Sequence, residues 1–422
     1  MMFRRNQSNL VVQELVDTAS ICERGGVREQ EPTEPMALSL RRMRVIVARD
    51  RKKNVSTRIQ LRGSTFERSD AVRLNKMIRG RSSKVTVVDL SWADFGDEKT
   101  ADLLCQALRN AQSMKELILY GNELGNGYNY LSNVLQTNKS LVKLRLGSNS
   151  FTKDVASSLA KGLSENKMLE ELDLWNCNLG DDAGTEILKG AKYANGLKAL
   201  RLSLNKLGPH SLNATCELVA KATALTTLNL DSNPNLFGKS KAANERFAQV
   251  LAENRNLLSL SLPNTGIDNH TASVIFQAMT RNDHLKYLDI CFNEAVTEDG
   301  YTAMVEYIPK IKSLEHLRTQ ACSKFIKTAP FVHAIERNTS LLQFTYICDG
   351  CDETVSSCLQ RNRVLSRAQR LLRDEEETTT PLSLFPKAIS RLAKHENGGA
   401  SAIFELLHHQ AIFQSVESKR GV

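Results

Sequence analysis

The sequence has 422 residues, of which 41% are hydrophobic, 24% charged and 6% aromatic. This composition is typical of a folded protein and excludes collagen-like, wholly disordered and membrane-embedded classes. No window approaches about eighteen consecutive apolar residues, and Glu14 and Asp17 interrupt the stretch where a secretory signal needs apolar residues. We therefore expect an intracellular, cytoplasmic protein whose nine cysteines are reduced.

The basic charge is concentrated at the N-terminus. Residues 1–84 hold 19 Lys and Arg against 9 Asp and Glu, whereas the net charge of the whole chain is +9. Residues 1–55 lack periodicity, which predicts a disordered basic arm. The run from Arg41 to Lys53 is typical of a nuclear-import signal, or of an arm that makes weak contacts with nucleic acid or an anionic membrane. A solvated charged tail is the alternative.

One pattern, LxxLxLxxNxL, recurs through the middle of the chain. It is clearest in the copies that begin at Met114, Leu141, Leu169 and Leu197. Weaker copies begin at Val85, Leu225, Leu257, Leu285, Leu314 and Leu341. Successive copies start 27 to 29 residues apart, except for one spacing of 32. A degenerate copy from Ser56 adds an eleventh unit, which predicts an N-terminal cap repeat over residues 56–84.

Each unit is predicted to be a strand followed by a helix. The fourth position is apolar in all eleven units, as expected for a short strand that sends alternate side chains into a core. These residues are Ile59, Val88, Leu117, Leu144, Leu172, Leu200, Leu228, Leu260, Leu288, Leu317 and Phe344. A helical pattern follows each turn, as where Ala183, Ile187 and Ala191 share one face.

The ninth position of the pattern carries a small polar residue. We expect its side chain to hydrogen-bond buried backbone in the turn after the strand. The residues at this position are Asn122, Asn149, Asn205, Asn233 and Asn293, with Cys177 and Cys322 as substitutes.

These units resemble the leucine-rich repeats of the ribonuclease-inhibitor type, in their length and in the Asn or Cys at the ninth position. The resemblance covers residues 56–373 and implies an α/β solenoid, shaped as a horseshoe, of about 11 repeats. It also implies a parallel sheet on the concave face and helices on the convex face.

Two units depart from the pattern. The 32-residue unit from Leu225 carries about four extra residues, which we place in a loop between strand and helix. In the unit from Leu314, Thr319 and Lys324 replace apolar residues, which predicts a looser or bent sheet there.

Three segments are predicted after the last strand. A long helix starts at about Thr354, and residues 374–381 form a polar linker. Residues 382–422 contain two amphipathic segments separated by a turn signal, which predicts a helical hairpin. We expect this hairpin to cap the open apolar end of the repeats.

Motifs for catalysis and cofactor binding are missing from the sequence. It contains no GxxxxGK[ST], strand-linked GxGxxG, HExxH or GxSxG. Cys348, Cys351 and Cys358 raise the question of zinc, but a fourth ligand at metal spacing is missing, and packing is the better interpretation. We therefore expect no enzyme activity, no cofactor and no metal.

The register also predicts which residues line the sheet surface, because the third, fifth and seventh positions point out of the core. The fifth positions of three consecutive strands are Arg145, Asp173 and Arg201, which predicts a ladder of ion pairs. Asp289 and Arg318 repeat this arrangement. Self-satisfied ion pairs without a binding role are the alternative.

Large aromatic residues fall on the same surface. Trp175 and Tyr120 occupy seventh positions, and Trp92 occupies an eighth position. Aromatic and arginine side chains carry much of the energy of protein interfaces. The predicted partner-binding residues are Trp92, Tyr120, Arg145, Asp173, Trp175 and Arg201. In the alternative, Trp175 merely lies flat over Gly147 and covers backbone.

Together these features favour a non-catalytic, monomeric scaffold that binds a protein on the concave face. The repeats are also similar to those of the Ran GTPase-activating protein, which implies an alternative function as a regulator of GTP hydrolysis. The acidic tail of that resemblance is reduced here to residues 374–377. A third resemblance, to the repeats of nucleotide-binding oligomerisation receptors, implies a detached repeat array.

Overall fold

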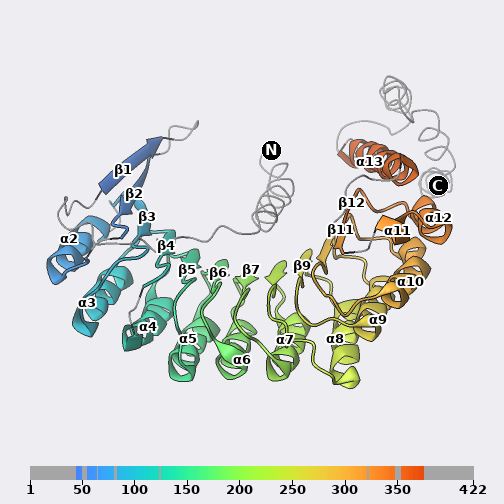
Figure 1. Cartoon of the computed structure of the whole chain (residues 1–422). Coiled ribbons are helices and arrows are strands. Elements are labelled where there is room, and N and C mark those ends of the chain that lie inside the picture. The colour runs from blue at the N-terminus through green and yellow to red at the C-terminus, as the bar shows by residue number, and fades with distance from the viewer. Residues whose placement is uncertain are drawn as a thin grey trace, which may run out of the picture. The chain divides into compact units, whose positions relative to one another are not determined.

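The computed structural model describes residues 44–49, 55–63, 65–79, 83–122, 125–320, 323–346 and 353–374. All of them belong to one compact unit, Met43–Val422. The described strands form a single open sheet of 12 strands, β1 to β12, whose order in space is their order along the chain. The helices follow the strands along one side of this sheet (Figure 1).

The strands are short and evenly repeated. Their bounds are β1 Arg44–Arg49, β2 Val55–Gln60, β3 Val85–Asp89, β4 Glu116–Ile118, β5 Lys143–Arg145, β6 Glu171–Asp173, β7 Ala199–Arg201, β8 Thr227–Asn229, β9 Ser259–Ser261, β10 Tyr287–Asp289, β11 His316–Thr319 and β12 Gln343–Tyr346. Strands β2 to β12 are parallel, and their fourth-position residues stand opposite one another, as in Leu172 against Leu200. The predicted solenoid, with a parallel sheet on one face and helices on the other, is therefore confirmed.

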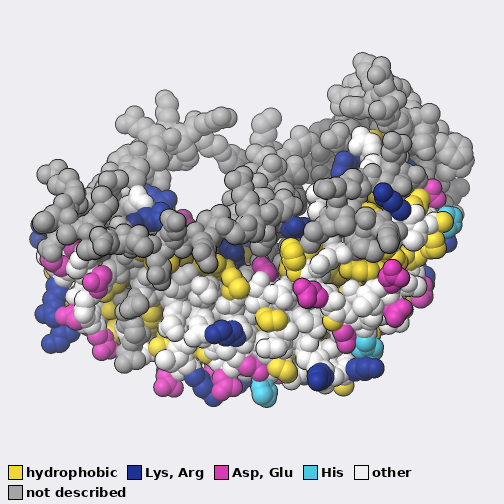
Figure 2. Space-filling view, in the orientation of Figure 1, with side chains coloured by type: hydrophobic (Ala, Val, Ile, Leu, Met, Phe, Trp, Pro, Cys, Tyr) yellow, Lys and Arg dark blue, Asp and Glu magenta, His cyan; other side chains and the backbone are white. Residues whose placement is uncertain are grey.

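A helix follows nearly every strand. The α-helices are α2 Arg68–Ile78, α3 Glu98–Arg109, α4 Asn129–Thr137, α5 Lys153–Glu165, α6 Gly180–Ala191, α7 Pro209–Lys221, α8 Lys241–Glu253, α9 Asn269–Met279, α10 Glu298–Tyr307, α11 Ser323–Ile326, α12 Ala329–Arg337 and α13 Glu353–Asp374. Short 3-10 helices occupy Gly125–Tyr128 and Ile308–Lys310. Ala183, Ile187 and Ala191 are buried on one face of α6, as predicted. Charged side chains of both signs lie along the helix side (Figure 2).

Strand β1 was not predicted. It pairs antiparallel with β2, from Arg44 opposite Gln60 to Arg49 opposite Val55, within the stretch that the sequence assigned to a disordered arm. Residues 45–48 are Val, Ile, Val and Ala, and β-branched residues favour strands. Their signal was hidden by the surrounding Lys and Arg. Residues 1–42, the linker after Asp374 and the hairpin over 382–422 lie outside the described residues.

The ninth-position residues form a ladder through the turns, as predicted. The amide nitrogen Nδ2 of Asn205 donates to the carbonyl oxygen of Leu174 (2.7 Å), one unit earlier. Its Oδ1 accepts from the backbone N–H of Cys177 (2.8 Å). Cys177 substitutes for asparagine by directing Sγ at the carbonyl of Leu146 (3.1 Å). Asn122, Asn149, Asn233 and Asn293 make related bonds, and Cys322 is not among the described residues.

A second asparagine ladder, which the sequence analysis missed, runs where the helices end. Asn138 donates to the carbonyls of Leu108 (2.7 Å) and Ala111 (3.0 Å), and its Oδ1 accepts from the Leu141 N–H (2.8 Å). The same role falls to Asn166, Asn254, Asn282 and Asn338. Each lies three residues before the first position of a repeat.

Helix α13 closes the described array. Its start at Glu353 agrees with the long last helix predicted from Thr354. Asn362 donates to the carbonyls of Asn338 (3.0 Å) and Leu341 (2.8 Å), groups that in the preceding units are covered by the next repeat. The helix therefore supplies the hydrogen-bond donor that a further unit would supply.

Both irregular units keep the sheet intact. The extra residues of the unit from Leu225 lie between β8 and α8, as predicted, and fold inward so that Phe237 packs edge-on against Phe247 (5.2 Å between ring centroids). Strand β11 pairs in register with both β10 and β12, so the predicted loosening at Thr319 is wrong. Thr319 is instead accommodated in the core with no exposed surface.

The turns after β2 to β10 use a left-handed backbone at the eighth position. This conformation costs a residue other than glycine about 1–3 kcal/mol. The eighth-position residues with φ between 49° and 62° are Gly63, Trp92, Gly121, Ser148, Asn176, Leu204, Ser232, Asn264 and Phe292. We call this row the strand-end rim.

Candidate functional site

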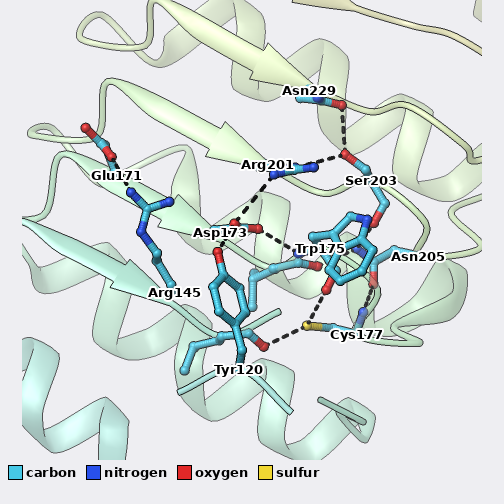
Figure 3. Close-up of polar contacts among 12 residues, drawn as sticks. Tyr120, Arg145, Glu171, Asp173, Trp175, Cys177, Arg201, Ser203, Asn205 and Asn229 are labelled. Atoms are coloured by element: carbon cyan, nitrogen blue, oxygen red, sulfur yellow. Dashed lines mark hydrogen bonds and ion pairs between the residues drawn. The ribbon is translucent and has the colours of Figure 1, made fainter. Parts of the chain in front are cut away.

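Five of the six predicted binding residues meet on one part of the sheet surface. Tyr120, Arg145, Asp173, Trp175 and Arg201 come from β4 to β7 and the turns that follow them (Figure 3). Trp92 lies beside this cluster on the strand-end rim, where half of its surface is exposed, and its backbone N–H donates to the carbonyl oxygen of Tyr120 (2.7 Å). The region from β4 to β8 that carries the five residues is called the strand-face site below.

Asp173 is the buried centre of the strand-face site. Its side chain is only 9% exposed. One carboxylate oxygen accepts the Trp175 backbone N–H (2.9 Å), and the other accepts the Tyr120 hydroxyl (2.6 Å). Arg201 approaches the second oxygen at 3.8 Å. Asp173 therefore positions its neighbours and offers little surface of its own to a partner.

Tyr120 reaches Asp173 by crossing an intervening strand. The crossing passes over Gly147, where an added Cβ would lie 2.7 Å from Tyr120 Cε1. The ring that covers Gly147 is therefore that of Tyr120, and the alternative that placed Trp175 flat over this glycine is wrong. Burial and the neighbouring Asp173 carboxylate raise the pKa of Tyr120, so its hydroxyl stays protonated and can donate.

The predicted ladder of ion pairs forms only in part. Arg201 lies beside Asp173, and Arg318 lies 3.1 Å from Asp289, as predicted. Arg145 instead contacts Glu116 (2.7 Å) and Glu171 (3.7 Å), third-position residues of the two flanking strands. Asp173 is already engaged by Tyr120 and by the backbone of its own turn. Arg145 therefore pairs with Glu116 and shares Glu171 with Lys143, which lies 2.6 Å from that glutamate.

A partner would meet the aromatic rings and one guanidinium. The Arg201 side chain is 40% exposed, and its contacts are long, at 3.8 Å to Asp173 and 3.5 Å to Ser203. Tyr120 and Trp175 are partly exposed. Ser203, which donates to Asn229 (2.9 Å), continues the polar network to β8. The site can therefore pack against an apolar group and pair with a carboxylate.

A second cluster of the same composition lies further along the sheet. Tyr287 donates to Asp289 (3.3 Å), and Arg318 lies beside both. The sequence analysis did not select Tyr287. Tyr287 occupies the third position of its unit, two residues before the fifth-position Asp289. A large aromatic residue at this spacing from an aspartate is the sequence signal that predicts the cluster.

The described residues contain no group of three or more His, Cys, Asp or Glu that could hold a metal ion. Cys358 is buried on α13, and Cys348 and Cys351 lie outside the described residues. Among the helices of the described region, none is both long and apolar enough to cross a bilayer.

The buried thiols are expected to be unreactive. Burial raises the pKa of Cys105 and Cys177 to about 12, and that of Cys216 to about 11. At pH 8, fewer than about one in a thousand of these thiols is ionised, and the thiolate is the reactive form. Iodoacetamide at pH 8, mapped by mass spectrometry, should leave all three unmodified in the native protein and modify them in guanidinium. Modification of Cys177 in the native state would contradict its burial.

Comparison with known proteins agrees with this architecture. Residues 165–188 match a family model described as "Leucine Rich repeat". Leucine-rich repeat-containing protein 73 of Rattus norvegicus is 32% identical over 180 residues, 41% of this chain and 55% of that protein. The ribonuclease inhibitor of Sus scrofa is 26% identical over 191 residues, which cover 44% of this chain and 41% of that protein. The chain therefore spans about half the length of these relatives.

A solved structure of similar extent is the leucine-rich repeat-containing protein LegL7 from Legionella pneumophila, with a TM-score of 0.45 and 18% identity over 72% of this chain and 97% of that one. The eleven parallel strands, the matching repeat and the relatives make the chain a leucine-rich repeat protein. Its units of strand and helix are those of the ribonuclease-inhibitor-like type. Proteins built from such repeats serve in general as protein-binding scaffolds.

Proposed function

We propose that the chain is a non-catalytic scaffold that binds a partner protein through the strand-face site. The observation that carries this proposal is the arrangement of Tyr120, Trp175 and Arg201, whose partly exposed side chains lie around a buried aspartate. Aromatic rings and arginine held in place before binding lose little conformational entropy when a partner docks.

The partner surface follows from the contacts that remain free. Arg201 is held only by long contacts, so a carboxylate of the partner can pair with it at shorter distance. Arg145 is shared by two glutamates and is less available. The expected partner therefore presents an apolar side chain next to an acidic one.

The test compares one surface substitution on each side of the solenoid. Trp175→Glu changes the strand-face site, whereas Tyr193→Glu changes a 55% exposed aromatic residue just after α6 on the helix side. Partners recovered from native extract would be purified, and their dissociation constants measured against the unaltered chain and both variants. We expect Trp175→Glu to raise the dissociation constant at least about tenfold, because a buried unpaired charge is costly. Tyr193→Glu should leave it unchanged.

Equal binding by all three proteins, with equal melting temperatures, would show that the strand face does not bind that partner. The identity of the partner separates the two functions weighed from the sequence. A GTPase whose turnover the chain accelerates would favour the regulator of GTP hydrolysis over the scaffold.

A further inference from the structure

Three large apolar residues are exposed on the strand-end rim. Trp92, Leu204 and Phe292 are 50%, 43% and 46% exposed. Each has a left-handed backbone, with φ of 59°, 58° and 58°. A residue in this conformation is strained, and the exposed half of its apolar side chain gains nothing from burial, so each residue carries two costs at once.

The fold does not require large residues at these positions. The other six members of the rim are glycine, serine or asparagine, which suit the left-handed region. The backbone hydrogen bond of the turn is the same with either kind of side chain. The Leu204 N–H donates to the carbonyl of the next unit (3.0 Å), as do those of Asn176 (2.9 Å) and Asn264 (3.0 Å).

The Trp92 side chain packs against a neighbouring turn. Its ring lies against Gly121 of the next turn, where an added Cβ would be 2.1 Å from the ring. Strained residues that the surrounding structure does not explain are most often found where a protein contacts a ligand.

The spacing of the three residues fits an extended chain. They follow β3, β7 and β10, which are four and three strands apart in the sheet. At about 4.8 Å per strand, the gaps are about 19 Å and about 14 Å. An extended segment covers these distances in about six and about four residues, both even numbers, so the three contacting side chains lie on one face.

A helix fits the same spacing less well. It would need about 13 and about 10 residues at about 1.5 Å each. With 3.6 residues per turn, side chains at these offsets point in different directions, so one helix face cannot reach all three anchors.

Charge around the two outer anchors restricts the occupant further. Exposed acidic residues follow both outer anchors in the sequence. After Trp92 these are Asp94, Asp97 and Glu98, where Arg68 pairs with Asp97 and Lys99 is also exposed, and after Phe292 they are Glu294, Glu298 and Asp299. A second copy of this chain, placed antiparallel along the rim, would bring acidic groups against acidic groups. A segment with basic residues at both ends is complementary instead.

We propose that the strand-end rim binds an extended segment of a partner protein, with three apolar side chains on one face and Lys or Arg at both ends. Trp92, Leu204 and Phe292 are the anchors. This surface borders the strand-face site, because Trp92 donates its backbone N–H to the Tyr120 carbonyl and Leu204 directly follows Ser203. Its anchor residues are different ones, so the proposal does not depend on the function proposed for that site.

The test uses synthetic peptides of one composition, labelled for fluorescence anisotropy. One matched peptide carries leucine at i, i+6 and i+10, and the other, for the opposite chain direction, at i, i+4 and i+10. Both have lysines at the two ends and serine and threonine between the leucines. The offset peptide carries leucine at i, i+5 and i+10, which turns the middle side chain to the opposite face. We expect one matched peptide to bind at least about tenfold tighter than the offset peptide.

Leu204→Asn and Phe292→Asn introduce a residue that the rim already uses at Asn176 and Asn264. Each substitution should weaken binding of the matched peptide at least about tenfold. The melting temperature of the variant should stay unchanged or rise, because backbone strain is relieved. Asn264→Ser and Tyr193→Glu are the controls and should leave peptide binding unchanged.

Equal affinity for matched and offset peptides, or no binding of either, would overturn the proposal. A lower melting temperature in Leu204→Asn would assign that residue to the fold instead. Dimers in sedimentation that Leu204→Asn abolishes would make a second copy the occupant and would likewise overturn the proposal.

Discussion

Replacing Asn205 with valine should lower the free energy of unfolding by about 3–5 kcal/mol. The valine fills a similar space but can neither accept the Cys177 N–H nor donate to the Leu174 carbonyl. Asn205 has no exposed surface, so water cannot replace these bonds, and each buried group left unpaired costs about 1–3 kcal/mol. Urea unfolding followed by circular dichroism measures the change.

Two further variants separate the ladder from the general effect of a substitution. Asn205→Cys should cost less than Asn205→Val, because Cys177 already fills the same position with a bond from Sγ to a carbonyl. Asn195→Val changes an exposed asparagine just before the same strand and should shift stability by no more than about 0.5 kcal/mol. A loss below about 1 kcal/mol in Asn205→Val would mean that the turn satisfies its backbone without the asparagine.

Replacing Gly147 with alanine should destabilise the protein by about 1–3 kcal/mol and disconnect Tyr120 from Asp173. The new Cβ would lie 2.7 Å from Tyr120 Cε1 and 2.9 Å from the Trp175 carbonyl oxygen, so the ring must move. Tyr120 then becomes more exposed and loses its hydrogen bond to the Asp173 carboxylate. Because burial and that carboxylate raise the pKa of Tyr120, this pKa should fall toward its ordinary value. Spectrophotometric titration of tyrosine at alkaline pH measures that return.

A double-mutant cycle tests whether the two effects share one cause. Tyr120→Ser removes the ring that the new methyl group strikes. If the clash with Tyr120 dominates, Gly147→Ala should cost clearly less in the Tyr120→Ser background than in the unaltered chain. Costs that simply add would place the strain at the Trp175 carbonyl instead, and the tyrosine titration would then stay as in the unaltered chain.

The sequence alone was sufficient to predict the solenoid. Every fourth-position residue lies on a strand, because a period of 27 to 29 residues repeats the same local signal eleven times. Strand β1 has no such repetition, and among the described strands it pairs with β2. Asn138 and its equivalents were missed because they lie outside the eleven-residue template, before its first leucine, although their offset of three residues is as regular.

The strand-face site was predictable in its members but not in their contacts. The repeat register correctly placed Arg145 opposite Asp173 on neighbouring strands. It could not show that the carboxylate oxygens of Asp173 already accept hydrogen bonds from Tyr120 and the Trp175 backbone. Tyr120 reaches an acceptor two strands away because Gly147, on the strand between them, has no side chain. This relation joins three units, and a one-unit template does not contain it. Leu204 and Phe292 were not predicted, because the repeat pattern leaves the eighth position unspecified and does not show its left-handed backbone.

The two asparagine ladders give the solenoid a direction. Asn149 and Asn205 each accept a backbone N–H from the turn of the preceding unit, that of Asn122 and of Cys177 respectively. Asn138 donates to a carbonyl at the end of α3, also in the preceding unit. During synthesis, the newest turn therefore lacks its partners until the following unit leaves the ribosome. The described units therefore complete their hydrogen bonds in order toward the C-terminus, and the last of these bonds forms when Asn362 donates to the Asn338 carbonyl.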